Sequence, residues 1–327
     1  MEQRMLGRTG RTVGVVGLGA WQLGGDWGSV SEDDAVAVLH AAVDAGVTFI
    51  DTADVYGDGR SERLVGRLLA ERPDAGLTVA TKMGRRVEQR PELYNRDNFR
   101  EWNDRSRENL GVDALDLVQL HCPPTAVYAD DEVFAALDEM VDEGRIRSYG
   151  VSVETVDEAR AAIARPHVAT VQIILNAFRL KPLEHVLPEA REAGVGIIAR
   201  VPLASGLLSG KYDEHTTFAP DDHRNYNRHG EAFDVGETFA GVPFEAGLAA
   251  VRDLRRIVPA DVAMAQFALR WIIDQPGLSV VIPGARNAEQ AQGNVAAAGL
   301  PALSEEQQAA VREVYDRHIR EHVHDRW

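Results

Sequence analysis

The sequence predicts an α/β fold: a (β/α)8 TIM barrel with an N-terminal β-hairpin and a long loop after the seventh strand. Short runs rich in Val, Ile and Leu alternate with longer segments of helical period along the 327 residues. The runs are continuously apolar, as in parallel strands that helices cover on both faces. Eight strand–helix pairs match a closed barrel of this size, so we expect residues 1–327 to form one barrel domain.

Each predicted strand is a short apolar run, and the predicted helices are the periodic segments between the runs. The strands are expected at 13–19, 47–51, 77–82, 116–121, 147–152, 168–173, 195–200 and 278–282. The helices are expected at 32–45, 61–71, 97–110, 131–143, 155–164, 183–193, 262–273 and 287–298. Candidate N-caps of these helices are Ser31, Ser61 and Asp261. Candidate glycines at the helix C-termini are Gly46, Gly144 and Gly194.

Two segments extend this pattern. Residues 4–13, with the turn Arg8-Thr9-Gly10, predict a hairpin before the barrel. Residues 204–243 form a long polar stretch, and a loop of that length in a compact domain is typically functional or disordered. A doubly wound open sheet is the alternative fold, and it normally has the fingerprint Gly-x-Gly-x-x-Gly before its first helix. This sequence has Gly17-Leu18-Gly19 but lacks the third glycine at that spacing. More glycine and tryptophan follow there, and we expect no helix at that point.

Charge and composition exclude several classes of protein. The chain has 51 Asp and Glu against 35 Lys and Arg, a formal net charge of −16, which disfavours nucleic acid and anionic lipid as partners. No apolar run approaches the ~18 residues of a membrane span, and the start resembles no signal peptide. With Cys122 as its single cysteine and no trusted metal-ligand pattern among His215, His223 and His229, we expect neither a disulfide nor a metal site. The sequence therefore predicts a cytoplasmic protein.

Polar side chains close several of the apolar runs. Asp51, Lys82 and His121 end three consecutive predicted strands, and Tyr56 follows shortly after the first of them. Taken singly, they could be a turn cap, a solvated strand end, a core histidine and a packed loop residue. A barrel brings the carboxyl ends of its strands to one mouth, so we expect these four side chains to meet.

The chemistry of the four is mutually consistent. A free Tyr has a pKa of ~10, and a neighbouring ammonium lowers it while a carboxylate holds the ammonium in place. Lowering that pKa to ~7–8 requires roughly 3–4 kcal/mol, which a paired Lys in a water-poor mouth can supply. Such a Tyr is a general acid for an oxygen that gains negative charge, and a histidine beside it can orient a carbonyl. Reduction of a carbonyl by hydride fits these roles.

The segments 49–57 (FIDTADVYG), 80–82 (ATK) and 120–121 (LH) resemble signatures of the aldo/keto reductase family. The segments 6–10 (LGRTG) and 17–21 (GLGAW) are similar to the family's start, and the resemblance spans nearly the whole chain. It implies a TIM barrel that binds NADPH or NADP⁺ in an extended pose, without a Rossmann domain. It also implies that Tyr56 is the acid/base, that Lys82 and Asp51 tune it, and that His121 positions the carbonyl.

The resemblance further implies a set of cofactor contacts. Ser152 and Gln172 match contacts to the nicotinamide amide, and segment 202–211 (PLASGLLSGK) resembles the loop that folds over the pyrophosphate. At the adenosine-phosphate end, a helix start and Arg286 can grip a 2′-phosphate, although Arg286 has an alternative as an ordinary charge at a helix start. The implied cofactor-binding residues are Trp21, Asp51, Ser152, Gln172, Arg200, Pro202, Leu203, Gly206, Leu208, Lys211, Gly284, Arg286, Gln290 and Asn294.

Two positions depart from the family pattern. Val153 stands where many members carry Asn, and Arg200 stands where many carry a Tyr that stacks on the nicotinamide. A guanidinium places a cation near a ring that becomes positive on oxidation, so we expect Arg200 to weaken NADP⁺ binding relative to NADPH. We also expect Arg200 to help neutralise the cofactor phosphates. Trp21 and Trp27 follow the first predicted strand. We expect them either to be core residues or to form part of the wall of a substrate pocket.

The expected function is NADPH-dependent reduction of an aldehyde or ketone, with Tyr56 protonating the oxygen. Within the same class, an NADP-dependent polyol or sugar dehydrogenase working oxidatively is the alternative. From another class, the family resemblance also admits a nucleotide-sensing subunit similar to the β subunits of potassium channels. The four residues at the barrel mouth fit each of these functions, and they do not discriminate between them.

Overall fold

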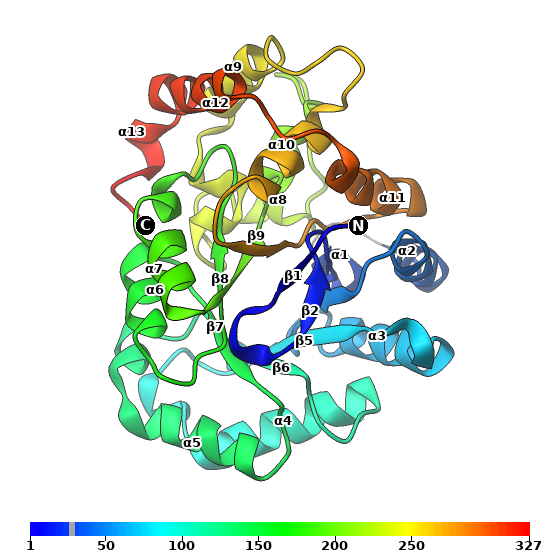
Figure 1. Cartoon of the computed structure of the whole chain (residues 1–327), viewed down its shortest axis with the longest axis vertical. Coiled ribbons are helices and arrows are strands. Elements are labelled where there is room, and N and C mark those ends of the chain that lie inside the picture. The colour runs from blue at the N-terminus through cyan, green and yellow to red at the C-terminus, as the bar shows by residue number, and fades with distance from the viewer. Residues whose placement is uncertain (26–29) are drawn as a thin grey trace.

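The computed structural model describes residues 1–25 and 30–327, so the predicted role of Trp27 lies outside the described residues. In this part of the chain, a sheet of eight parallel strands pairs in chain order (Figure 1). The strands are β3 (Leu18–Gly19), β4 (Phe49–Asp51), β5 (Thr78–Met83), β6 (Leu117–His121), β7 (Tyr149–Ser152), β8 (Thr170–Ile174), β9 (Gly196–Arg200) and β10 (Leu278–Val281). Parallel bridges from Val16 to Val281 and from Gly19 to Gly284 join the first strand to the last, which closes the predicted barrel.

Helices surround the barrel (Figure 1). Those that match predicted segments are α2 (Glu32–Asp44), α3 (Arg60–Glu71), α4 (Arg96–Leu110), α5 (Asp131–Asp142), α6 (Val156–Ile163), α7 (Val186–Ala193), α10 (Met264–Ile273) and α11 (Ala288–Ala296). Two long helices were not predicted, α9 (Phe244–Leu254) and α12 (Glu305–His318), and they pack against each other. Short helices are α8 (His223–Tyr226), α13 (Arg320–Val323) and α1 (Trp21–Gly24); α1 lies where we expected no helix.

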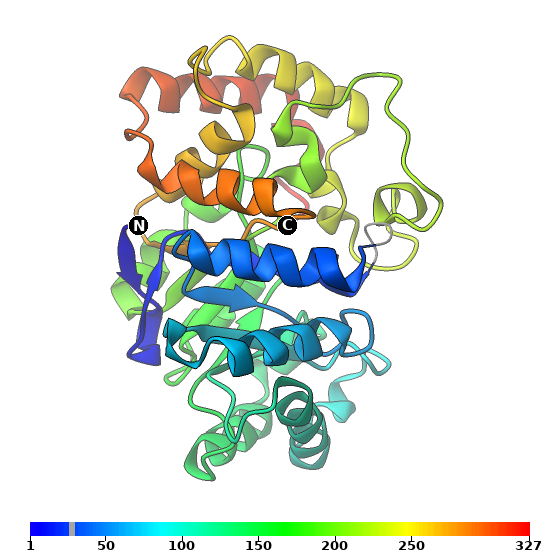
Figure 2. The ribbon, with the colours of Figure 1, turned by 90° about the vertical axis from the view of Figure 1, so that its right-hand side faces the viewer.

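The N-terminal hairpin is confirmed and covers one end of the barrel. Its strands β1 (Gln3–Met5) and β2 (Thr12–Gly14) pair antiparallel, so the barrel strand predicted at 13–19 begins later, at β3. Leu6 and Val13 are fully buried and pack against barrel residues such as Phe49. Figure 2 shows the hairpin at one end of the barrel and the long loop at the other. The hairpin therefore seals the end of the barrel away from the predicted site.

Some predicted helix ends are confirmed and others are wrong. Ser31 caps α2 by accepting a hydrogen bond from the backbone N–H of Asp34, and Gly194 ends α7 with a φ of 71°. Ser61 is not a cap, because α3 begins one residue earlier and buries Ser61, whose hydroxyl donates to the carbonyl of Ala20 at 2.9 Å. Asp261 is exposed and lies before Ala263, the residue at the N-cap position of α10.

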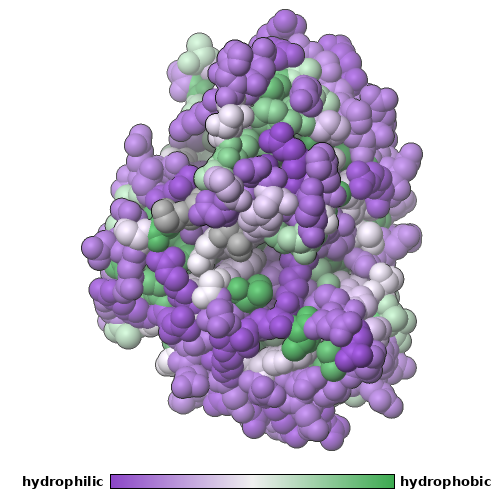
Figure 3. All heavy atoms as spheres, turned by 180° about the vertical axis from the view of Figure 1, so that it is seen from behind, coloured by the Kyte–Doolittle hydropathy of each residue, from purple (hydrophilic) through white to green (hydrophobic). Residues whose placement is uncertain are grey.

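The predicted long loop after β9 is confirmed. It holds α8 and several single turns of 3₁₀ helix, among them Ala204–Ser209, Val235–Glu237 and Phe239–Gly241. The surface seen in Figure 3 is mostly hydrophilic with scattered hydrophobic patches. None of the helices in the described ranges is long and apolar enough to cross a membrane.

Candidate active site

Lys82 is the centre of the polar cluster at the barrel mouth. It lies in β5 with 1% of its surface exposed, and its ammonium donates three hydrogen bonds. The acceptors are Asp51 Oδ1 at 2.5 Å, the carbonyl of Thr52 at 2.9 Å and the hydroxyl oxygen of Tyr56 at 3.3 Å. An ammonium has three hydrogens, so all of them are used. Because Tyr56 accepts from Lys82, its own hydroxyl proton is directed elsewhere.

The second oxygen of Asp51 is held by two buried amides. Gln172 Nε2 donates to Asp51 Oδ2 at 2.7 Å and Gln119 Nε2 donates at 3.2 Å. Gln172 Nε2 also donates to Gln119 Oε1 at 3.3 Å. Gln119 was not predicted, although the register places it beside Lys82 on the neighbouring strand. Asp51 therefore has a fixed orientation, which in turn fixes Lys82.

Tyr56 lies between two other rings of the mouth. Its ring stacks on Trp21 with centroids 6.0 Å apart and meets His121 edge-on at 5.9 Å. Burial raises the pKa of Tyr56, and the positive charge of Lys82 offsets this only in part. The expected lowering of this pKa to about 7–8 is therefore wrong, because desolvation of the phenolate outweighs the attraction of one ammonium.

Lys82 and His121 carry different charges at neutral pH. Burial lowers the pKa of Lys82, but Asp51 and Tyr56 outweigh it and the pKa of Lys82 is raised. Burial and the nearby cations Arg85, Lys82 and Arg200 hold the pKa of His121 well below its usual value. Lys82 is therefore an ammonium, whereas His121 is a neutral imidazole with one N–H to donate.

A cavity of about 380 Å³, here called the cleft, extends from Tyr56 and His121 along the barrel mouth. Most residues expected to bind a cofactor line it: Trp21, Asp51, Gln172, Arg200, Pro202, Leu203, Gly206, Lys211, Gly284, Arg286, Gln290 and Asn294. Ser152 and Leu208 are buried and do not line it. The wall also includes residues that were not predicted, such as Gln22, Ser205, Tyr212 and Arg224.

The cleft has the properties of a ligand site. Three buried polar atoms in its wall, His121 Nδ1, Arg200 Nε and Gln22 Oε1, have no hydrogen-bond partner among residues 1–25 and 30–327. A Cβ at Gly284 would lie 2.0 Å from the end of the Gln22 side chain, so the Gln22 amide packs directly against this glycine. Buried polar atoms without partners are rare in folded proteins and indicate a site where a ligand or water binds.

Positive charge gathers at the part of the cleft that α11 borders. Asn287 caps this helix by accepting from the backbone N–H of Gln290, and Gln290 Oε1 accepts from the backbone N–H of Arg286 at 2.9 Å. Arg286 and Lys211 are both exposed, and neither side chain forms an ion pair within the described residues. A helix N-terminus with two cationic side chains nearby favours an anion such as a phosphate.

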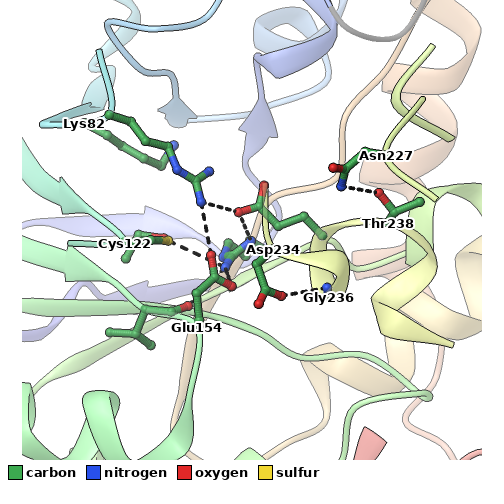
Figure 4. A network of polar contacts seen from close by, with 12 residues as sticks. Lys82, Cys122, Glu154, Asn227, Asp234, Gly236 and Thr238 are labelled. Carbon is green, nitrogen blue, oxygen red and sulfur yellow. Dashed lines mark hydrogen bonds and ion pairs between the residues drawn. The ribbon is translucent and has the colours of Figure 1, made fainter. Parts of the chain in front are cut away.

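Arg200 forms ion pairs instead of leaving its charge free. Its Nη2 lies 2.8 Å from Glu154 Oε2 and donates to the carbonyl of Val153 at 3.0 Å, and Nη1 lies 3.6 Å from Glu237. Arg85 bridges the same two carboxylates, at 2.7 Å from Glu237 and 3.1 Å from Glu154. Figure 4 shows Glu154 within this network of polar contacts. The structure therefore gives no support to Arg200 as a free charge for the phosphates.

The two carboxylates of this cluster differ in their affinity for a proton. Burial raises the pKa of Glu154 to about 7, against the attraction of Arg200. Burial also disfavours ionised Glu237, but the charges of Arg85 and Arg200 outweigh it and lower the pKa of Glu237 to about 2. At neutral pH, Glu237 is therefore ionised, whereas Glu154 holds a proton more readily than an ordinary glutamate. Arg85 and Glu154 each lie two residues after the end of a strand. A search for polar residues just beyond the strand ends, as well as at them, would have predicted both as site residues.

Cys122, Glu154 and Glu237 offer ligand atoms within 4.8 Å of one another, a spacing compatible with a metal ion. Burial raises the pKa of Cys122 to about 12, so its sulfur is a protonated thiol and a poor ligand. The two carboxylates already have guanidinium partners. The chemistry of this group therefore favours an ion-pair cluster over a metal centre.

A second cavity of about 480 Å³, here called the side cavity, also opens on Tyr56 and His121. One side is aromatic, with Trp21 and Phe233 packed at 5.8 Å between ring centroids. The other side is polar and includes Arg85, Gln89, Glu154, Asp234 and Glu237. A small molecule there would lie beside Tyr56 and His121 and have hydrogen-bonding groups along one flank.

These features define a class: a (β/α)8 barrel with a cluster of buried ionisable side chains at the strand ends, beside a cleft that suits an anionic cofactor. The chain belongs to the aldo/keto reductase family of oxidoreductases, whose profile matches residues 15–316.

Among its relatives, the aldo-keto reductase YhdN of Bacillus subtilis is 33% identical over 316 residues, 94% of this chain and 92% of that protein. A glycerol dehydrogenase of Gluconobacter oxydans has a solved structure with a TM-score of 0.78 and 31% identity, covering 97% of this chain and 95% of that one. An aldo-keto reductase of Bacillus halodurans, solved in its holo form, has a TM-score of 0.77 at 25% identity, covering 97% and 99%.

Proposed function

We propose that the protein is an NADPH-dependent reductase of aldehydes or ketones in which Tyr56 is the general acid. The observation that carries the proposal is the hydrogen bond from Lys82 Nζ to the Tyr56 hydroxyl oxygen. This bond leaves the hydroxyl proton free to point into the cavities beside a neutral His121. Burial raises the pKa of Tyr56, so the hydroxyl is protonated at neutral pH, and the positive charge of Lys82 acts in the opposite direction by favouring the phenolate.

The cleft suits NADPH. Arg286, Lys211 and the start of α11 would hold the phosphates, and the preference for NADPH over NADH rests on Arg286. Trp21, Gln172 and Arg200 line the same cleft as Tyr56 and would hold the nicotinamide. NADPH bound there supplies the hydride that reduces the carbonyl carbon.

The residues of the chain supply the proton and the orientation. His121 would donate its single N–H to the carbonyl oxygen and hold it near Tyr56. As negative charge develops on that oxygen, Tyr56 transfers its proton, and the Lys82 ammonium stabilises the phenolate that forms. Asp51, bound by Gln119 and Gln172, keeps Lys82 in position during the transfer. Aromatic walls around the side cavity limit the access of water.

The polar flank of the side cavity favours a second candidate, the NADP-dependent oxidation of a polyol or sugar. Gln89, Arg85 and Glu237 can hydrogen-bond hydroxyl groups, while Trp21 and Phe233 offer apolar surface to the carbon skeleton. The relative from Gluconobacter oxydans is named as a glycerol dehydrogenase, which fits such a substrate.

Steady-state assays test both candidates. We expect loss of NADPH absorbance with aldehydes or ketones, and much slower loss with NADH as the control cofactor. Formation of NADPH from NADP⁺ with glycerol or sugars, faster than the reduction of any carbonyl, would favour the second candidate. An absence of turnover in both directions across the panel would refute the proposed function.

A further inference from the structure

Trp327 packs behind one wall of the side cavity, although it lines neither cavity itself. Only 7% of its surface is exposed, and its indole Nε1 donates to Asp234 Oδ1 at 3.0 Å. Asp234 and Glu237 both line the side cavity and belong to the long loop after β9. A residue some ninety positions later therefore contacts the loop that forms this wall.

The ring of Trp327 fits closely against the loop backbone. A Cβ at Gly241 would lie 2.5 Å from the ring, and one at Gly236 would lie 3.1 Å from it, so glycine gives the indole its space. On another side, the Arg179 guanidinium lies 4.1 Å from the ring centroid and also donates to the carbonyl of Ala240 at 3.2 Å. The indole is thus held by contacts with the segment 234–241 and with Arg179.

Asp234 connects the indole to the polar wall. The same Oδ1 atom accepts from Trp327 and from the backbone N–H of Gly236 at 2.6 Å, and the second bond caps the 3₁₀ turn Val235–Glu237. Figure 4 shows the hydrogen bond between Asp234 and Gly236. That turn ends at Glu237, whose side chain reaches Arg85 and Arg200 and whose carbonyl accepts from the Ser205 hydroxyl at 3.2 Å. The position of Glu237 therefore depends on a turn that Trp327 holds from behind.

We propose that Trp327 is a positioning residue for Glu237 and so sets the affinity of the side cavity for its substrate. This inference rests on the proposed function for the identity of that substrate as a carbonyl compound. Without the indole, Asp234 loses a donor and the backbone at Gly236 and Gly241 loses its packing surface. Glu237 then leaves its place between the two guanidinium groups for part of the time, and the polar flank of the cavity loses one of its carboxylates.

Kinetics of four variants test the proposal: Trp327→Phe, Trp327→Ala, Glu237→Gln and the double variant Trp327→Ala/Glu237→Gln. We expect Trp327→Ala to raise KM for a hydroxylated aldehyde such as glyceraldehyde about tenfold, while kcat and the Kd of NADPH change less than about threefold. Trp327→Phe keeps a ring but loses the N–H, so its KM should lie between those of the wild type and Trp327→Ala. In the double variant, KM should not exceed that of Glu237→Gln, because both changes act on one group.

Phe134→Ala is the matched control. Phe134 is a buried aromatic with 5% exposure and an Arg165 guanidinium 4.5 Å from its ring centroid, and it lines neither cavity. We expect this variant to lower Tm without changing KM. If Trp327→Ala also lowers Tm with an unchanged KM, or if the KM effects of Trp327→Ala and Glu237→Gln multiply, Trp327 is a stability residue and the proposal is overturned.

Hydrogen exchange separates this inference from the proposed function. If the wild type reduces no carbonyl, the proposed function fails, but the amides of 234–241 still report on Trp327. They should exchange faster in Trp327→Ala than in the wild type or in Phe134→Ala. Unchanged exchange there would overturn the positioning role whatever the activity.

Discussion

The ammonium of Lys82 lies 2.5 Å from Asp51 Oδ1, and the two side chains are 1% and 4% exposed. Burying two charges is costly, and the pair is retained because each partner also holds other groups. Asp51 is bound by two glutamine amides, and Lys82 extends to the Tyr56 hydroxyl. The ion pair therefore links the barrel interior to the proposed proton donor.

Lys82→Met tests the buried pair. It leaves Asp51 charged and without its partner, so we expect a loss of about 3–5 kcal/mol in the free energy of unfolding and no turnover. Urea denaturation measures the first quantity and NADPH oxidation the second. The double variant Asp51→Asn/Lys82→Met should recover part of the stability but none of the activity. A fully stable single variant would contradict this account.

Tyr56→Phe removes the proposed proton donor and keeps the ring. We expect turnover to fall by at least about 10²–10⁴-fold, the usual contribution of a general acid, while Kd for NADPH stays within about twofold. Assays of NADPH oxidation and fluorescence titration of NADPH give the two numbers. Retained turnover with intact cofactor binding would remove Tyr56 from its proposed role.

Arg200→Tyr tests the departure at the nicotinamide end of the cleft. The cation near an oxidised ring should disfavour NADP⁺, so the variant should bind NADP⁺ more tightly relative to NADPH. Calorimetric Kd values for both forms measure this ratio. Glu154→Gln is the control, because it removes the ion-pair partner but keeps the guanidinium. An unchanged ratio in Arg200→Tyr, or an equal change in the control, would show that the guanidinium does not discriminate.

Asp54→Asn tests the pH dependence of stability. Asp54 is 2% exposed, and burial, with a contribution from Glu62, raises its pKa to about 7. In the unfolded chain its pKa is ~3.9, so the folded state keeps a proton that the unfolded state releases. The stability that this proton provides is present below about pH 4 and is lost as the pH rises to about 7.

The variant should therefore match the wild type near pH 4 and exceed its free energy of unfolding by a few kcal/mol near pH 8, at about 1.4 kcal/mol per pKa unit. Urea denaturation at both pH values measures the difference. Asp58→Asn is the control: Asp58 is exposed, and hydrogen bonding to Arg105 lowers its pKa. It should lose stability at the higher pH, the opposite sign. Equal curves for Asp54→Asn and the wild type would contradict the raised pKa.

Arg286→Ala tests the phosphate end of the cleft. Losing a cation beside the start of α11 should raise KM for NADPH about tenfold, as expected for the loss of a charge-assisted contact, and change KM for NADH less than about twofold. Arg256→Ala is the matched control, since Arg256 is an exposed arginine paired with Asp253 at 3.1 Å and does not line the cleft. Equal effects on both cofactors would argue against a 2′-phosphate contact at Arg286.

The predicted elements agree with the structure where the local pattern was strong. Continuous apolar runs located β4 to β10, and periodic segments located the helices between them. The prediction failed at β3, because the first part of its run pairs in the hairpin instead, and it missed α9 and α12. Strand pairing depends on residues distant in the chain, which the periodicity of one segment does not reveal.

The partners of the site residues were harder to predict than the residues themselves. Gln119 holds Asp51 because the register of β5 and β6 places it beside Lys82, and register is not visible in either strand alone. Glu237 lies in a loop with no periodic pattern, and only the folded loop brings it to Arg85 and Arg200.

The sequence by itself predicted the barrel and predicted that Asp51, Tyr56, Lys82 and His121 meet at its mouth. Apolar periodicity and a position at or just after a strand end are local properties, so they can be recognised in the sequence. Only the tertiary structure decided the charge states. Tyr56 has a raised pKa and the Arg200 guanidinium is ion-paired with Glu154 and Glu237, since desolvation and ion pairing depend on distances that exist only in the packed chain.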